Sequence, residues 1–196
     1  MLVVSRYESL LRLTSGINLF TIKQVYLVLD TGSSDTWIVH NGFECLDDEN
    51  GYKVNQAMCH FGPTYNGTFQ EGQIKDENFK IPYMDGTIVS GVLGHSDVTI
   101  GGVKVTNQEI ALVDKAYWTG DNFTSGILGL AYKQLTAAFR GADATRDDFT
   151  EGNAPGNFVH YSPIVQTMIA QGLNPPLFSV ALQRSTTANA AVPGGK

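Results

Sequence analysis

The chain has 196 residues, of which 42% are hydrophobic and 16% charged, and its formal net charge is -6. This length is sufficient for one domain with its own hydrophobic core. The acidic charge balance argues against nucleic acid as a partner. The sequence contains no apolar run of about 18 residues that would indicate a membrane span. Low charge and 21 glycines together favour a mostly β protein.

The N-terminal segment, residues 1–24, predicts little structure by itself. The stretch from Met1 to Glu8 is interrupted too early by polar side chains to make a convincing secretory signal. We therefore find no signal peptide in this chain.

The segment 25–39 carries the strongest pattern in the sequence. Its first five residues are apolar and lead directly into Asp30, which predicts a strand buried on both faces with a carboxylate in the interior at its end. The next residues, from Thr31 to Ser34, offer hydroxyl and backbone N–H donors to that carboxylate. A buried acid held in this way is catalytic more often than structural. The alternative is a plain turn in which Asp30 binds its own backbone.

Two cysteines and two sequons point towards the secretory route. Cys45 and Cys59 could close one small loop, and Asn66 and Asn122 each begin an Asn-x-Thr acceptor site for glycosylation. In the alternative interpretation the cysteines are free and the sequons are unused. His60 follows Cys59, but without a Cys-x-x-Cys pair or a fourth ligand we expect no metal site.

Turn signals and one helical pattern complete the chain. The dipeptide Asp85-Gly86 joins two apolar runs over 79–94 and predicts a β-hairpin. Residues 140–160 are polar and glycine-rich, typical of a surface insertion. The clearest helix is predicted over 162–172, with Ser162 as its cap, Pro163 in its first turn and Gly172 at its end. Its apolar stripe of Ile164, Val165, Met168 and Ile169 should cover the sheet.

The string Asp30-Thr31-Gly32-Ser33-Ser34, followed by Trp37 and preceded by an apolar strand, resembles the active-site signature of the pepsin-like aspartic proteases. The hairpin over 79–94 resembles the flap of that family, which folds over the substrate. The match rests on Tyr83, Asp85, Gly86, Thr87 and Gly91, while Met84 stands where a glycine is common.

The resemblance extends to other parts of one lobe. Ser125–Leu130 is similar to the family string Asp-Gly-Ile-Leu-Gly-Leu, with serine in place of the acid. A side chain at Gly129 would collide with the active-site loop, so we interpret this strand as support for Asp30. The strand that family members carry before the active site is not recognisable here, and we expect a truncated or misjoined N-terminus with an unpaired sheet edge.

The resemblance implies a fold, domain limits and residue roles. The fold is a closed or partly open β-barrel with a flap hairpin and a short helix. Residues 1–24 are atypical, 25–183 form the N-terminal lobe, and 184–196 form a disordered tail. Asp30 is one of two catalytic carboxylates, with Ser33 bonded to its outer oxygen and Trp37 bonded to Tyr83. The implied substrate-binding residues are Gly32, Tyr83, Asp85, Gly86 and Thr87; the supporting residues are Thr31, Ser33, Trp37 and Gly129.

The second catalytic acid is not visible, because Asp30-Thr31-Gly32 is the only Asp-Thr/Ser-Gly string in the chain. The family acts on peptides through two carboxylates that share a proton and needs no cofactor. We therefore expect half of an aspartic endopeptidase, inactive alone, whose partner is a missing C-terminal lobe. Two alternatives remain: a homodimer with one Asp30 per chain, and a peptide-binding module without catalysis. The family also implies a secreted, vacuolar or lysosomal location.

Overall fold

We describe the protein from a computed structural model. The structure describes residues 2–4, 8–14, 22–47, 49–141 and 157–180. The predicted tail lies outside these residues, as does most of the predicted insertion. Within the described ranges, no helix has the length and apolar character needed to cross a membrane.

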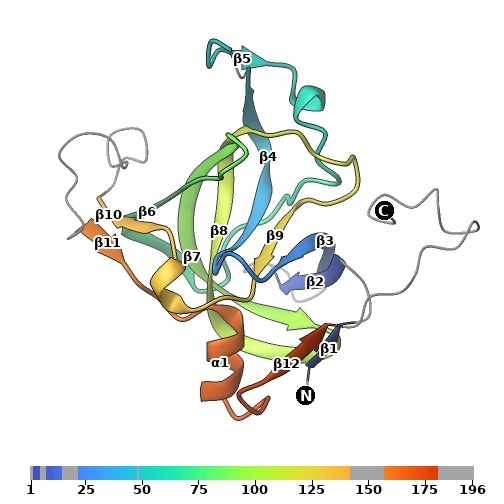
Figure 1. The fold of residues 1–196 in the computed structure, drawn as a ribbon, viewed down its shortest axis with the longest axis vertical. Coiled ribbons are helices and arrows are strands. Elements are labelled where there is room, and N and C mark those ends of the chain that lie inside the picture. Colours follow the sequence, from blue (N-terminus) through green and yellow to red (C-terminus); the bar gives the residue numbers. More distant parts are fainter. Residues whose placement is uncertain (1, 5–7, 15–21, 48, 142–156, 181–196) are drawn as a thin grey trace, which may run out of the picture.

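The fold is mostly β, as the sequence predicts, and most strands belong to a single sheet (Figure 1). Successive pairings lead from β7 through β2, β3, β9, β4 and β8 back to β7, so these strands form a barrel. The strands of this sheet are β2 (Glu8–Thr14), β3 (Ile22–Asp30), β4 (Thr36–Leu46), β5 (Lys53–Val54), β6 (Gly72–Pro82), β7 (Ile88–Ile100), β8 (Val103–Tyr117), β9 (Gly126–Gly129), β10 (Ala138–Arg140) and β11 (Phe158–Val159).

Two hydrophobic clusters fill the interior, and strands β4 and β9 contribute side chains to both of them. One cluster includes Leu27 and Ile38 and continues onto the helix α1 (Ile164–Ala170). The other includes Trp37 and Phe79 and lies towards the flap. Because neighbouring side chains on β4 point to opposite faces, the buried residues Trp37 and Ile38 contribute to different clusters.

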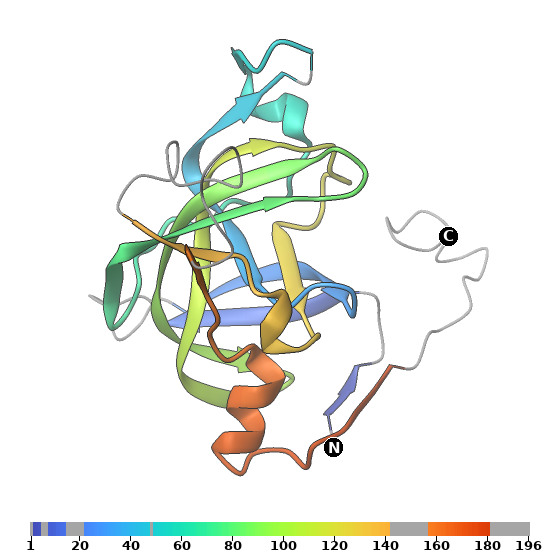
Figure 2. The ribbon, with the colours of Figure 1, turned by 60° about the vertical axis from the view of Figure 1, so that its left-hand side comes forward.

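The helix α1 covers one end of the barrel, below β7 and β8 in Figures 1 and 2. Of the predicted apolar stripe, Ile164, Val165 and Met168 are buried. The fourth member, Ile169, is partly buried and packs against the same cluster. The helix ends as predicted, with Gly172 at a φ of 69° and the Gly172 N–H donating to the carbonyl of Ile169. The predicted cap was wrong. Pro163 is the N-cap residue, and no side chain caps the helix.

Beyond the barrel, β1 (Leu2–Val4) and β12 (Phe178–Val180) form a separate parallel pair (Figure 2). The expectation of an unpaired edge before residue 25 was also wrong, because β2 pairs with both β3 and β7. Residues 1–24 do not carry the strand pattern that the family resemblance led us to look for. The backbone nonetheless forms a strand where two neighbouring strands offer hydrogen-bonding partners.

The strand before Asp30 is not buried on both faces, which corrects the sequence prediction. Val25 and Leu27 are buried, but Tyr26 is 39% exposed, and Val28 and Leu29 are partly exposed. A barrel strand has one face towards the core and one away from it. The outward ring of Tyr26 packs instead against Phe123, with ring centroids 4.5 Å apart.

Candidate active site

Asp30 lies at the end of β3, and its carboxylate accepts hydrogen bonds from Gly32 and Ser33. The Gly32 N–H donates to Asp30 Oδ1 at 2.8 Å, and the Ser33 hydroxyl donates to Asp30 Oδ2 at 2.5 Å. The side chain is half-buried and not interior, so the prediction of a fully buried acid was wrong. Thr31 and Gly32 are exposed. This combination leaves the carboxylate fixed in orientation and still partly exposed.

The turn after Asp30 is tied to the segment that follows β9. The Leu130 N–H donates to the carbonyl of Asp30 at 2.8 Å, and the Ala131 N–H donates to the carbonyl of Ser33 at 3.0 Å. The Ser34 hydroxyl, which we expected to serve Asp30, instead donates to the carbonyl of Tyr132 at 2.5 Å. These bonds make the turn a fixed part of the barrel.

Gly129 is the point of closest approach between this turn and β9. A Cβ atom at Gly129 would lie 2.3 Å from the carbonyl carbon of Ser34 and 2.5 Å from the backbone nitrogen of Asp35. Neither distance is sterically possible, so only glycine fits. The predicted close passage of this strand beside the active-site loop is confirmed.

The flap is connected to the same turn through Trp37. The fully buried Trp37 donates its indole N–H to the Tyr83 hydroxyl at 2.7 Å, a contact that the family resemblance led us to expect. Trp118 packs edge-on against both rings, with centroids 5.2 Å from Trp37 and 5.6 Å from Tyr83. Burial raises the pKa of the Tyr83 phenol well above its ordinary value, so it stays neutral at physiological and acidic pH.

The tip of the flap is a tight turn between β6 and β7 with its own hydrogen bonds. The Tyr83 N–H donates to the carbonyl of Thr87 at 2.7 Å, and Gly86 has a φ of 92°, as the Asp-Gly turn requires. The Thr87 hydroxyl and N–H both donate to Asp85 Oδ1, and they hold the pKa of that carboxyl below its usual value. Met84 is fully exposed at the tip.

Sequence reasoning missed a second acid in the motif. Asp35 is fully buried, and its carboxylate accepts hydrogen bonds from the Tyr161 hydroxyl at 2.5 Å and the Ala137 N–H at 3.1 Å. Burial raises the pKa of Asp35 to about 6. The signal was its position directly before a buried apolar strand, where a carboxylate needs partners. Those partners are 102 and 126 residues away in the sequence, so the pattern could not name them.

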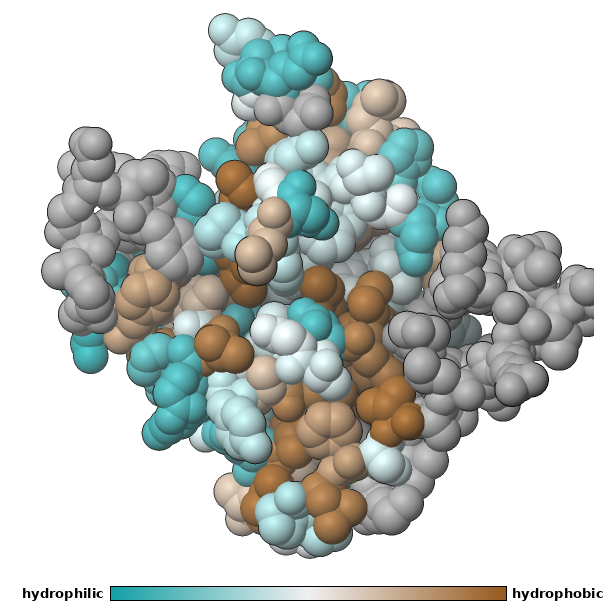
Figure 3. All heavy atoms as spheres, viewed as in Figure 1, coloured by the Kyte–Doolittle hydropathy of each residue, from teal (hydrophilic) through white to brown (hydrophobic). Residues whose placement is uncertain are grey.

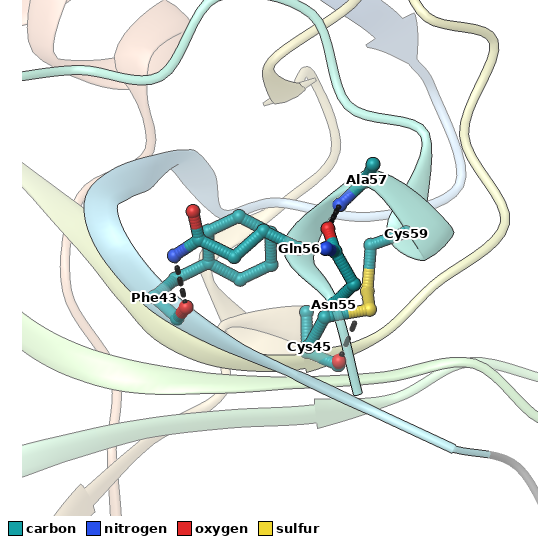
Figure 4. The surroundings of a disulfide bond; sticks show 7 residues. Phe43, Cys45, Asn55, Gln56, Ala57 and Cys59 are labelled. Atoms are coloured by element: carbon teal, nitrogen blue, oxygen red, sulfur yellow. Dashed lines mark hydrogen bonds between the residues drawn. A yellow bond between two sulfur atoms is a disulfide. The ribbon is translucent and has the colours of Figure 1, made fainter. Parts of the chain in front are cut away.

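The loop beside the flap contains the disulfide between Cys45 and Cys59, whose Cα atoms are 5.9 Å apart (Figure 4). Around it, Asn55 caps the short turn of residues 56–59, and the Gln56 amide donates to the carbonyl of Phe43 at 2.5 Å. Among the described residues, no group of three or more His, Cys, Asp or Glu side chains could hold a metal ion.

The two sequons differ in their surroundings. Asn66 and Thr68 are both exposed. Asn122 is exposed as well, but it has a φ of 60°, and its partner Thr124 is buried and hydrogen-bonded to Asp121.

Comparison with known proteins assigns the family. A sequence profile of the eukaryotic aspartyl proteases matches residues 16–195. A probable aspartic-type endopeptidase of Aspergillus fumigatus is 42% identical over 163 residues, which cover 82% of this chain and 34% of the relative. Mucorpepsin of Rhizomucor pusillus is 32% identical over 177 residues, covering 87% of this chain and 36% of the relative. The chain therefore belongs to the eukaryotic aspartyl protease family.

The fold comparison agrees with this assignment. The crystal structure of an aspartic proteinase from Irpex lacteus superposes with a TM-score of 0.52 at 18% identity. The match covers 86% of this chain and 38% of the other. The chain thus spans about a third of the length of the relatives it matches, and it has the fold of one part of such a proteinase.

Proposed function

We propose that this chain supplies the N-terminal lobe, residues 25–183, and one of the two catalytic carboxyls of an aspartic endopeptidase. The observation that supports this most directly is the cradle of Asp30, in which an accessible carboxylate is fixed by Gly32 and Ser33. In this chemistry two carboxyls share one proton. The ionised carboxyl takes a proton from a water that attacks the scissile carbonyl, and the protonated one donates to the carbonyl oxygen.

We assign peptide binding to the active-site turn and the flap. Tyr83, Asp85, Gly86 and Thr87 form the flap turn, and the Trp37 indole fixes the Tyr83 ring relative to Asp30. Gly32 leaves its exposed backbone open to a substrate main chain. In this proposal the flap closes over the bound peptide and reduces its contact with water.

A second carboxyl must come from a partner lobe or a second copy of the chain. Large hydrophobic side chains remain exposed after the end of α1 and along β12: Leu173 at 40%, Leu177 at 51% and Val180 at 40%. Figure 3 shows hydrophobic residues gathered on this part of the face. A soluble surface rarely leaves such groups together without a partner, which supports a covering lobe. The disulfide and the exposed Asn66 support a secretory location.

Cleavage of a fluorogenic peptide at acid pH tests this proposal. A monomer verified by sedimentation should show little turnover. Co-folding with the C-terminal lobe of the Aspergillus fumigatus relative should produce cleavage that a pepstatin-type inhibitor blocks. Asp30→Asn in that complex should abolish cleavage, while Asp114→Asn, on the surface beside His40, should not.

The other interpretations give different results in the same assay. Robust, inhibitor-sensitive turnover by the verified monomer would contradict the half-site. Activity that rises with the square of protein concentration would indicate a homodimer. Unchanged peptide affinity in Asp30→Asn, with no cleavage in any complex, would indicate a binding module.

A further inference from the structure

Asp35 has no place in the chemistry proposed for Asp30, yet its carboxylate is the most completely enclosed acid of the motif. It is 0% exposed and lies between two distant segments of the chain. Its Oδ1 accepts from the Tyr161 hydroxyl at 2.5 Å and the Ala137 N–H at 3.1 Å, and its Oδ2 lies 3.2 Å from the same N–H.

These contacts connect the active-site turn to the segments that lead into β10 and α1. Ala137 immediately precedes β10, and Tyr161 lies three residues before α1. The backbone carbonyl of Asp35 also accepts from the Gly129 N–H at 3.0 Å, so the residue is bound on the β9 side as well. Movement of Asp35 would break contacts with all three segments at once.

We propose that Asp35 is a positioning residue, whose buried carboxylate fixes the turn between Asp30 and Trp37 by binding Ala137 and Tyr161. Asp30 lies five residues before it, and Trp37 lies two residues after it and binds the flap at Tyr83. The consequence for catalysis rests on the proposed function of Asp30, whereas the effect on Trp37 does not.

The environment of Asp35 makes this role measurable through pH. Burial raises the pKa of Asp35 to about 6, while the Tyr161 hydrogen bond acts in the opposite direction. The other titratable groups near it are Tyr83 of the flap and Glu109 of β8, each of which interacts electrostatically with its charge. His160 is adjacent to Tyr161 in the chain, and His95 faces Glu109 across the sheet. Because Asp35 lies two residues before Trp37, we expect its ionisation to shift the NMR resonance of the Trp37 indole N–H.

The first experiment follows the indole N–H resonance of Trp37 by NMR as a function of pH in the full chain. Trp118→Phe assigns the resonance, because the chain has two tryptophans. We expect a titration with a midpoint near pH 6. Asp35→Asn should remove this titration, and Tyr161→Phe should move its midpoint upwards. The double variant His95→Gln, His160→Gln should retain it. A titration near pH 6 that persists in Asp35→Asn, or that disappears in the histidine variant, would refute the proposal.

The second experiment tests whether the hydrogen bonds accepted by Asp35, and not only the volume of its side chain, hold Trp37 in place. In Asp35→Asn the amide oxygen can still accept from both Ala137 and Tyr161, so the Trp37 indole should keep its slow hydrogen exchange. In Asp35→Ala both donors lose their acceptor, and we expect exchange at least 10-fold faster. Asp114→Ala is the control and should exchange like the original chain.

If Asp35→Ala does not fold, Tyr161→Phe replaces it, with an expected acceleration of at least 3-fold. Unchanged exchange in the folded variant would contradict the proposal. The measurement requires no proteolytic activity, so its outcome is independent of the proposed function.

Discussion

Glu109 makes the stability of this fold depend on pH in a direction that can be measured. Its side chain is 13% exposed, and its Oε1 has no hydrogen-bond partner within the described part of the chain. Burial raises the pKa of Glu109 from 4.5 to about 8, and the negative charges of Glu77 and Asp35 contribute in the same direction. His95 Nε2 on β7 lies 4.0 Å from Glu109 Oε2, and this contact is an ion pair only when the imidazole is protonated.

The sign follows from the protonation of the folded and unfolded chains. Between pH 4.5 and pH 8 the folded chain holds a proton on Glu109 that the unfolded chain has lost, so the folded state becomes less stable as pH rises. At 1.36 kcal/mol for each pKa unit, the greatest loss of unfolding free energy that this shift can cause is about 5 kcal/mol. Because the side chain is partly exposed and His95 is close, we expect about 2 kcal/mol after screening.

Glu109→Gln removes this dependence with little change in shape. At pH 4.5 the variant and the original chain should unfold at similar urea concentrations, because both side chains are neutral. At pH 8.5 the variant should be more stable by about 2 kcal/mol. Glu44→Gln is the control, because Glu44 lies on the surface beside Lys53 and Lys115, and it should give no gain at pH 8.5. Equal stability of Glu109→Gln and the original chain at pH 8.5 would refute the reasoning.

Three further substitutions test the supports of the site. Tyr83→Phe removes the acceptor of the buried indole N–H and should cost about 1–2 kcal/mol in urea unfolding; no loss would mean that the contact is not formed in solution. Cys45→Ser opens the loop closed to Cys59 over a separation of 14 residues. It should cost about 3 kcal/mol, a loss that addition of reductant to the original chain should reproduce. Gly129→Ala places a methyl group against the Ser34 backbone and should cost about 3 kcal/mol, so a folded variant of unchanged stability would contradict the close approach.

Much of the site could be predicted because its information is local. Asp30, Gly32 and Ser33 are neighbours in the sequence, and a carboxylate that accepts from the next few residues needs no distant partner. The turn at Gly86 is similarly determined by residues within it, because it requires a positive φ that glycine adopts readily. Among the predictions that failed, the burial of β3, the burial of Asp30 and the unpaired edge before residue 25 each depended on which distant segments lie beside the element.

The sequence by itself determined the strand-turn-strand around Asp30, the flap turn, the helix with its apolar stripe, and the family to which the chain belongs. The tertiary structure decided that Asp30 is half-exposed, that β2 completes the barrel, and that Asp35 is enclosed by Ala137 and Tyr161. The physical reason is the range of the interactions. Backbone conformation and hydrogen bonds to adjacent residues are encoded locally, whereas burial and the partners of a buried charge exist only after distant segments have packed together.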